Sequence, residues 1–236
     1  MRCDDLDRPL PSLPCSLFVT QITFQERLLF GLSGFRSLLH NMDVKAVVYS
    51  AARKDIRDGD LLMFRSRDWY TRLFAIAGRT EYVHAAMAGW WNGRLMCVEM
   101  TSSGGRAQLL SNIVEQWPGV CDVYRANAAR RRFSRQKALL AMIAITGKPY
   151  GRWNLWRAAL LHLPLLRFCV RPDMDDAEES AWPPFCSQAV SMACRAGGVD
   201  PVPHLADRLT EPADLARSSF FQYRFTLGGE SNANVQ

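Results

Sequence analysis

The dipeptide Asn92-Gly93 is the feature of this sequence that most constrains its fold. It lies between two apolar, strand-like runs at 82–91 and 94–100. Asn-Gly is the strongest short-range signal for a two-residue β-hairpin, because a type I′ turn needs positive φ at both central positions. The sequence therefore predicts an antiparallel hairpin whose register is set by the turn.

That register brings two polar residues together. If Trp91 faces Arg94, then Ala86 faces Glu99. Opposed residues and residues two apart on one strand share a face, so His84 and Glu99 are diagonal neighbours, with Cβ atoms about 7–8 Å apart or somewhat less. An imidazole and a carboxylate can hydrogen-bond over this distance. The small side chains along this face of 84–88 leave room for another element to pack closely.

Turn and capping signals along the rest of the chain predict a mixed α+β order without internal repeats. We expect an N-terminal extension over 1–50, one folded domain over 51–227 and a disordered tail over 228–236. Further strands are expected at 60–65 and 120–125, and helices at 23–40 (amphipathic, opened by a capping box), 69–77, 134–147 and 186–196.

Composition and charge limit the class of protein. A chain of 236 residues that is 48% hydrophobic and 22% charged is typical of a globular protein. Its seven cysteines are odd in number and irregularly spaced, which favours free thiols over a disulfide framework. The net charge of +6, carried mostly by arginine, suits an anionic partner such as a cell-wall polymer or a phospholipid headgroup. Nucleic acid is not expected, since the only dense basic run is Arg130–Arg132 with Arg135.

Neither end of the chain nor its most apolar segment predicts membrane insertion. The N-terminus is acidic and interrupted by prolines, so no Sec signal is expected and synthesis in the cytoplasm is predicted. The most apolar stretch, Leu155–Val170, contains charged residues and a proline and falls short of the ~20 apolar residues that a spanning helix needs. This stretch is expected to contact a membrane surface at most.

Cys186 is the candidate nucleophile. Two prolines precede Phe185 and deliver the chain in extended form to a helix that begins at the cysteine itself. The helix dipole and the free N–H groups of the first turn lower a thiol pKa and can donate to a developing oxyanion. Cys186 also lies on the apolar stripe of its helix, which faces inward. With His84 and Glu99 it forms the expected pattern of a nucleophilic triad, in which the thiol at the helix start is aimed at the sheet that bears those two residues.

Each of these residues also has a plain structural interpretation. A buried cysteine is usually a small core residue, and we interpret Cys97, Cys121, Cys169 and Cys194 in this way. A lone histidine on a strand is often a hydrogen-bonded core group, and a lone glutamate is often solvated. Zinc is the rival use of cysteine and histidine, but the sequence has no Cys-x-x-Cys or His-x-x-x-His pair. No metal or cofactor is therefore expected, and the convergence of three residues favours the triad.

At these residues the chain resembles a known family, the circularly permuted NlpC-type papain-like amidases of the YaeF/YiiX type, which are related in fold to lecithin retinol acyltransferase. The resemblance implies a papain-like α+β fold in which an antiparallel sheet or small barrel packs against the nucleophile helix, with 51–227 as the catalytic domain. The matching stretches, in chain order, are 57–64, 81–87, 98–99, 147–150, 185–190 and 211–215.

The resemblance also implies residue roles. Cys186 would be the nucleophile, His84 the general base and Glu99 the residue that orients His84. Tyr150 matches a tyrosine that lies near the thiol in such enzymes and helps with the oxyanion; a core aromatic is the alternative interpretation. Gln188 departs from the family pattern, where a glutamate is common.

The implied activity is hydrolysis of an amide bond through a thioester acyl-enzyme. Cell-wall (peptidoglycan) peptide is the first expected substrate, and its cleavage would require delivery by a phage particle, by lysis or by a dedicated secretion system. Two alternatives stay open. The protein could be an acyl-lipid amidase, thioesterase or acyltransferase that uses Leu155–Val170 at an interface. It could also be a non-catalytic module whose N-terminal helix docks on a larger assembly.

Overall fold

The computed structural model describes residues 46–65, 80–127, 132–150 and 183–229. The chain divides into two units, Met1–Asp43 and Val44–Gln236, and every described residue belongs to the second. The helices expected at 23–40 and 69–77, the apolar stretch Leu155–Val170 and the end of the expected tail lie outside the described residues.

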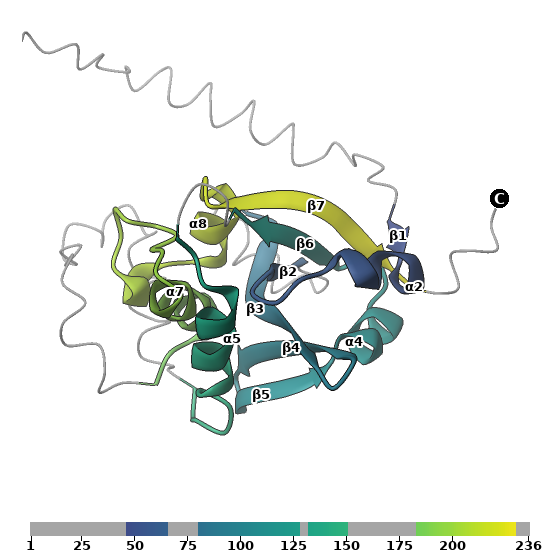
Figure 1. Ribbon diagram of the computed structural model, residues 1–236, viewed down its shortest axis with the longest axis horizontal. Helices are drawn as coiled ribbons and strands as arrows, with labels where there is room; N and C mark the ends of the chain where they lie inside the picture. The colour runs from purple at the N-terminus through teal and green to yellow at the C-terminus, as the bar shows by residue number, and fades with distance from the viewer. Residues whose placement is uncertain (1–45, 66–79, 128–131, 151–182, 230–236) are drawn as a thin grey trace, which may run out of the picture. The chain divides into compact units, whose positions relative to one another are not determined.

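The described residues form a mixed α+β fold around an open seven-stranded sheet (Figure 1). The strand order is β1-β7-β6-β2-β3-β4-β5. Neighbouring strands are antiparallel, apart from the parallel pair β1 and β7. The strands are β1 (Val47–Val48), β2 (Leu61–Arg65), β3 (Tyr82–Trp91), β4 (Arg94–Thr101), β5 (Gly104–Leu109), β6 (Cys121–Ala126) and β7 (Phe221–Gly228).

Helices lie on both sides of this sheet. Figure 1 shows α5, α7 and α8 on one side and α2 and α4 on the other. α5 begins after Ser134, whose hydroxyl accepts from the Lys137 N–H at 3.3 Å, as the capping preference of serine predicts. The helices are α2 (Tyr49–Ala52), α4 (Leu110–Gln116), α5 (Arg135–Ile143), α7 (Cys186–Ala196) and α8 (Pro212–Arg217), with 3₁₀ turns at Arg53–Asp55 and Asp207–Leu209.

The predicted hairpin is confirmed. Asn92 has φ 49° and Gly93 has φ 74°, the positive values that a type I′ turn requires. Trp91 pairs with Arg94 and Ala86 pairs with Glu99. The local chemistry of the turn therefore fixed the register of β3 and β4.

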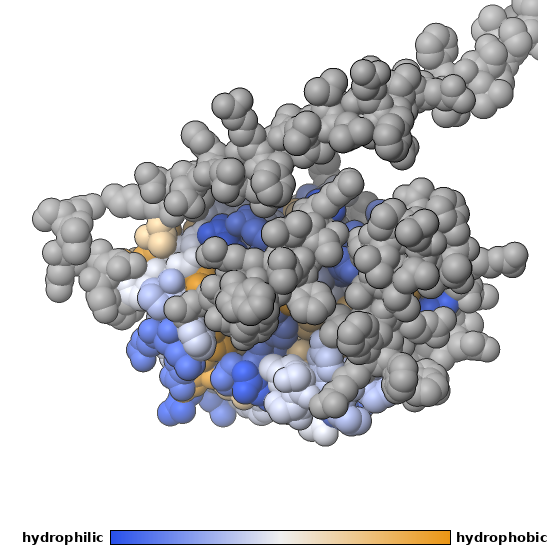
Figure 2. All heavy atoms as spheres, turned by 180° about the vertical axis from the view of Figure 1, so that it is seen from behind, coloured by the Kyte–Doolittle hydropathy of each residue, from blue (hydrophilic) through white to orange (hydrophobic). Residues whose placement is uncertain are grey.

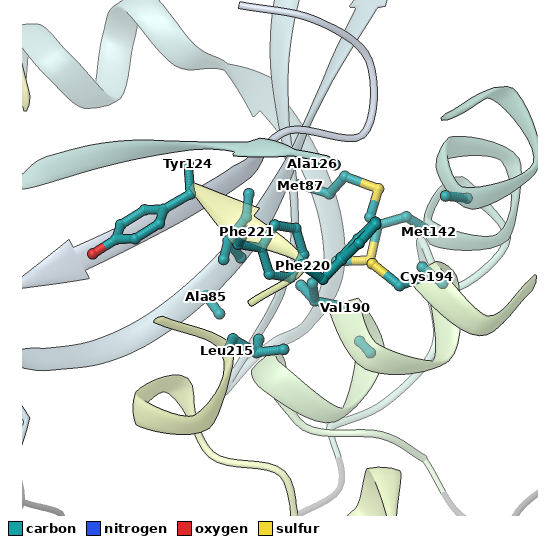
Figure 3. Close-up of a cluster of buried hydrophobic side chains, with 14 of the residues drawn as sticks. Ala85, Met87, Tyr124, Ala126, Met142, Val190, Cys194, Leu215, Phe220 and Phe221 are labelled. Carbon is teal, nitrogen blue, oxygen red and sulfur yellow. The ribbon is translucent and has the colours of Figure 1, made fainter. Parts of the chain in front are cut away.

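Two apolar clusters cover the two faces of β3 and β4. On one face, Met87 and Val98 pack with residues of α5 and α7, and Figure 3 shows Met87, Met142, Val190 and Cys194 converging there. On the other face, Ala86 packs in a second cluster with residues of α2 and α4. Each fully buried Met, Val or Leu side chain contributes about 1.5–3 kcal/mol. Burial on both faces explains why the 82–91 run is apolar almost throughout instead of alternating.

Several elements differ from the sequence-based expectations. The strands β5 and β7 and the helices α4 and α8 had not been predicted. The sheet also extends beyond the expected domain limits, since β1 lies within 1–50 and β7 ends at Gly228. The sheet is open, with β1 and β5 at its edges, and is not closed into a barrel.

The surface is mixed in polarity. Seen from the side opposite to Figure 1, hydrophilic side chains form several patches with smaller apolar areas between them (Figure 2). Among the described residues, no helix combines the length and the apolar character needed to span a bilayer.

Candidate active site

His84 and Glu99 are hydrogen-bonded across β3 and β4. The Nε2 of His84 lies 2.7 Å from Oε2 of Glu99. The predicted diagonal arrangement on one face of the hairpin is therefore present. The ring of Phe64, which faces His84 from β2, lies 5.5 Å from the imidazole between centroids and fixes it from the other side.

Glu99 is a buried carboxylate with a full set of donors. It is 4% exposed, and its second oxygen, Oε1, accepts from Arg106 Nε at 2.8 Å and from Gln108 Nε2 at 2.7 Å. Burial alone would raise the pKa of Glu99, but the hydrogen bonds and charges of His84 and Arg106 lower it below its ordinary value. Glu99 is therefore ionised, and His84 Nε2 donates to it.

The sheet splits at this point. The pairs between β3 and β4 run from Trp91–Arg94 to Ala86–Glu99 and extend no further. Beyond them, β3 stays paired with β2 as far as Tyr82, and β4 stays paired with β5 as far as Thr101. The two strands thus part, and backbone groups of β3 that would have bonded to β4 become available to another element.

The thiol of Cys186 accepts a hydrogen bond from one of these backbone N–H groups. By strand alternation the Ala85 N–H points toward β4, and it donates instead to the Cys186 sulfur. The N–H of Ser187, in the first turn of α7, donates to the same sulfur. Cys186 therefore lies in the split at the N-terminus of α7, where helix N–H groups have no partner within the helix.

Helix α7 packs on the face of the sheet opposite to the one that bears His84. Ala189 and Val190 of α7 pack in the cluster that contains Ala85, whereas His84 lies on the face of Ala86, which is covered by α4. The Cys186 thiol nevertheless hydrogen-bonds with His84, beside the point where the ladder of β3 and β4 ends. The pattern of alternating side chains cannot predict such an end, because it assumes that the ladder continues.

The Cys186 thiol and the His84 imidazole are hydrogen-bonded, and each shifts the pKa of the other. Burial raises the pKa of Cys186, which is 4% exposed, but the hydrogen bond and charge of His84 and the two backbone N–H groups lower it below its ordinary value. Burial lowers the pKa of His84, but the hydrogen bonds and charges of Cys186 and Glu99 raise it to about 10. The two groups therefore favour each other's charged form, the thiolate and the imidazolium.

The geometry also assigns the two nitrogens of His84. Nε2 is committed to Glu99 at 2.7 Å. Nδ1 is the nitrogen left to face Cys186, with which His84 also forms a hydrogen bond. The proton that can move between the thiol and the imidazole is therefore the one on Nδ1.

Tyr150 completes the group around the thiol. Its side chain packs against Phe185 and Cys186. Burial, together with the charge of Cys186 and a hydrogen bond to its side chain, raises the pKa of Tyr150 well above its ordinary value, and the Cys186 backbone N–H also bonds to the hydroxyl. The tyrosine is thus neutral, and its hydroxyl can donate to the sulfur.

The start of α7 lacks an ordinary cap. The N-cap residue, Phe185, has no side-chain oxygen that could accept from the first turn. Its own backbone N–H donates to Gln188 Oε1 at 3.4 Å. Gln188 therefore closes the helix start without placing a negative charge near the thiol. In the first turn, the Ser187 N–H donates to the sulfur and the Cys186 N–H donates to the Tyr150 hydroxyl.

The other described cysteines have raised thiol pKa values, in contrast to Cys186. Cys97, Cys121 and Cys194 are buried free thiols, and burial raises the pKa of each. The core interpretation of these three agrees with the structure, while Cys169 lies outside the described residues. Within the described parts of the chain, no three His, Cys, Asp or Glu side chains are grouped so that they could hold a metal ion.

Sequence reasoning missed Arg106 and Gln108, because it did not predict β5. A signal for them existed. Thr101 is followed by a short turn, Ser102-Ser103, and extending the hairpin register through it by one more strand places Arg106 opposite Glu99, as the structure shows. An opposite-charge pair facing across two strands is a recognised cross-strand interaction.

No protein-family model matches this chain, and no curated protein matches it. Among solved structures, the chain is similar to the crystal structure of metalloprotein yiiX from Escherichia coli O157:H7, with a TM-score of 0.49 and 13% sequence identity over 72% of this chain and 97% of that chain. A likeness at this level does not extend to residue roles or to activity.

Proposed function

We propose that this protein is a cysteine hydrolase of the permuted papain-like type, which cleaves an amide bond through a thioester acyl-enzyme. The observation that carries the proposal is the chain of contacts at the split in the sheet: buried Glu99 holds Nε2 of His84 at 2.7 Å, and His84 in turn holds the thiol of Cys186 at a helix N-terminus. A carboxylate, an imidazole and a thiolate in this order are the three members of a nucleophilic triad.

The first half-reaction forms the acyl-enzyme. The Cys186 thiolate attacks the carbonyl carbon, a C–S bond forms, and negative charge moves to the carbonyl oxygen. The Cys186 backbone N–H and the Tyr150 hydroxyl, which bond to each other before substrate binds, donate to that oxyanion. The proton on Nδ1 of His84 passes to the leaving nitrogen as the C–N bond breaks.

The second half-reaction releases the product. Neutral His84 takes a proton from water through Nδ1, and the hydroxide attacks the thioester carbon. The C–S bond breaks, the acid leaves, and the thiolate–imidazolium pair is restored. Glu99 keeps the imidazole in one orientation and stabilises its positive charge throughout.

Cell-wall peptide is the proposed substrate class. The net charge of +6 supports an anionic polymer, because a basic surface concentrates such a substrate near the site. An acyl-lipid amide or ester is the competing class, and the competing protein class is a binding module that keeps this core without turnover.

The test compares substrates and variants. The wild-type chain and Cys186→Ala are incubated separately with purified muropeptides and with acyl-lipid vesicles, and products are identified by mass spectrometry. We expect cleavage of muropeptides by the wild type and none by Cys186→Ala. Cys194→Ala, the same change in the same helix, is the matched control and should retain turnover. Full activity of Cys186→Ala would contradict the mechanism, and cleavage of the lipids alone would replace the substrate class.

A further inference from the structure

Strand β5 contributes no member of the triad. It nevertheless contacts Glu99, which holds His84, and the segment that leads to Tyr150, and both His84 and Tyr150 bond to the Cys186 thiol. It is the edge strand of the sheet, and among the strands it pairs with β4 alone. One part of it contacts Glu99, and another contacts the segment that leads to Tyr150. The two contacts depend on different residues of β5.

The first contact fixes the Glu99 carboxylate. Arg106 Nε and Gln108 Nε2 both donate to Oε1, at 2.8 and 2.7 Å, and so leave Oε2 for His84. Arg106 faces Glu99 in the ladder and Gln108 is its diagonal neighbour, so both donors come from a paired strand. Two donors on one oxygen prevent the carboxylate from rotating. The orientation of the His84 ring therefore depends on β5.

The second contact docks the chain before Tyr150. The Gly105 N–H donates to the Lys148 carbonyl at 2.9 Å, and the Gly147 N–H donates to the Gly105 carbonyl at 2.7 Å. A Cβ at Gly105 would lie 2.1 Å from the Ile145 carbonyl oxygen, a distance that no real side chain adopts. Only glycine permits this close approach of two backbones.

The neighbouring glycine supports the same contact. Gly104 has φ 114°, and a Cβ there would lie 2.7 Å from the Lys148 carbonyl oxygen. The docked backbone ends two residues before Tyr150, whose hydroxyl bonds to Cys186. A shift of this backbone would therefore move the hydroxyl away from the thiol.

We propose that Gly105, Arg106 and Gln108 are positioning residues of the thiol site, the first through Tyr150 and the other two through Glu99. The inference rests on the proposed function for the reaction that the site performs. The positioning itself affects the reactivity of the Cys186 thiol, which can be measured without a substrate.

The Tyr150 side of the proposal is tested with a double-mutant cycle of Gly105→Ala and Tyr150→Phe. The readout is the rate of iodoacetamide alkylation of Cys186 against pH, followed by mass spectrometry. Loss of a hydrogen bond to a thiolate should move the acid limb of this profile upward by about one pH unit in Tyr150→Phe. Gly105→Ala should give a similar shift, and the double variant no further shift. Additive shifts would overturn the role of Gly105.

Folding is controlled in the same experiment. Gly93→Ala strains the hairpin turn, where φ is 74°, but has nothing within 4 Å of the added Cβ and should leave the alkylation profile unchanged. The midpoint of thermal unfolding is measured for every variant. Loss of cooperative unfolding in Gly105→Ala would also overturn its positioning role, because the glycine would then be required by the fold and not by the site.

The Glu99 side uses Arg106→Ala and Gln108→Ala, each made in the wild type and in Glu99→Gln. In the wild type each should slow alkylation of Cys186 at pH 7 by about threefold to tenfold, since each removes one hydrogen bond to a charged group. In the Glu99→Gln background neither should add to the effect of that change. Arg94→Ala, an exposed arginine at the other end of the hairpin, is the control and should have no effect. Equal effects in both backgrounds would overturn the proposal.

The outcomes separate this inference from the proposed function. If alkylation depends on β5 as described but no amide or ester is cleaved, the hydrolase proposal fails and the positioning of the thiol stands. If muropeptides are cleaved but the cycles are additive, β5 is only a scaffold and the hydrolase proposal stands.

Discussion

Helix α7 carries two buried cysteines, one at its start and one near its end, and their thiol pKa values are shifted in opposite directions. Cys186, at the first position, has a lowered pKa, whereas Cys194, eight residues later, has a raised one. Burial raises the pKa of both. The difference comes from partners: Cys186 has the His84 imidazole and two backbone N–H donors, while Cys194 packs in the apolar cluster with Val190. A thiol in a protein core is inert until a cation and free donors converge on it.

Removal of His84 should have the largest effect on the reactivity of Cys186. In His84→Ala the Cys186 thiol keeps its burial but loses the cation, so its pKa should rise above the ordinary value, as that of Cys194 does. Alkylation of Cys186 at pH 7 should fall by about a hundredfold or more. His204→Ala, an exposed histidine, is the control. Unchanged alkylation in His84→Ala would show that the helix N-terminus alone activates the thiol.

Replacing Glu99 by glutamine should have the next largest effect. The amide can still accept from His84 but carries no charge, so the pKa of His84 should fall from about 10 and that of Cys186 should rise. The acid limb of the alkylation profile should move upward by about one pH unit. NMR titration of the imidazole measures the His84 pKa directly. A His84 pKa that stays the same would mean that Cys186 alone maintains the imidazolium.

The pH dependence of stability tests whether Cys186 and His84 are coupled in the folded protein. His84 has a raised pKa, so its contribution to stability is complete below its unfolded value of 6.5 and is lost as the pH rises through about 10. Cys186 has a lowered pKa, so its contribution is complete above its unfolded value of 9.0 and is lost as the pH falls through the folded value. The two slopes oppose each other where the two windows overlap, which is above 6.5 and below 9.0.

The pair should therefore contribute a plateau of stability over that window and lose it on both sides, with slopes of up to about 1.4 kcal/mol per pH unit. Urea unfolding of the wild type and of His84→Ala/Cys186→Ala across pH 5–10 gives the pair's contribution by difference. A difference that changes steadily through the window would mean that the thiol and the imidazole do not share one proton.

Cys194→Ala should give the smallest effect. The change removes one sulfur from a packed cluster, so a loss of about 1 kcal/mol of unfolding free energy is expected. The alkylation profile of Cys186 should stay the same, and Cys194 itself should react in the wild type only on unfolding. Rapid alkylation of Cys194 in the folded protein would contradict the assignment of the two ends of α7.

The parts of the fold that could be predicted are those set by local chemistry. Asn92-Gly93 determined the turn, and the turn determined the pairing of Ala86 with Glu99. The proline-led start of α7 was also predicted to the residue. In contrast, β5 begins with Gly104-Gly105, which has little preference for a strand, and it forms because β4 is there to pair with it. For β7 a usable signal was present, since its aromatic residues favour a strand.

The sequence by itself determined the hairpin, the contact between His84 and Glu99 and the place of Cys186 at a helix start, because each follows from the conformational preferences of a few adjacent residues. Only the tertiary structure decided how these parts meet. The ladder of β3 and β4 ends at Ala86 and Glu99, α7 packs on the face opposite to His84, and β5 holds Glu99 and the segment before Tyr150. Such contacts join segments distant along the chain, and they depend on which strands compete for the same backbone groups.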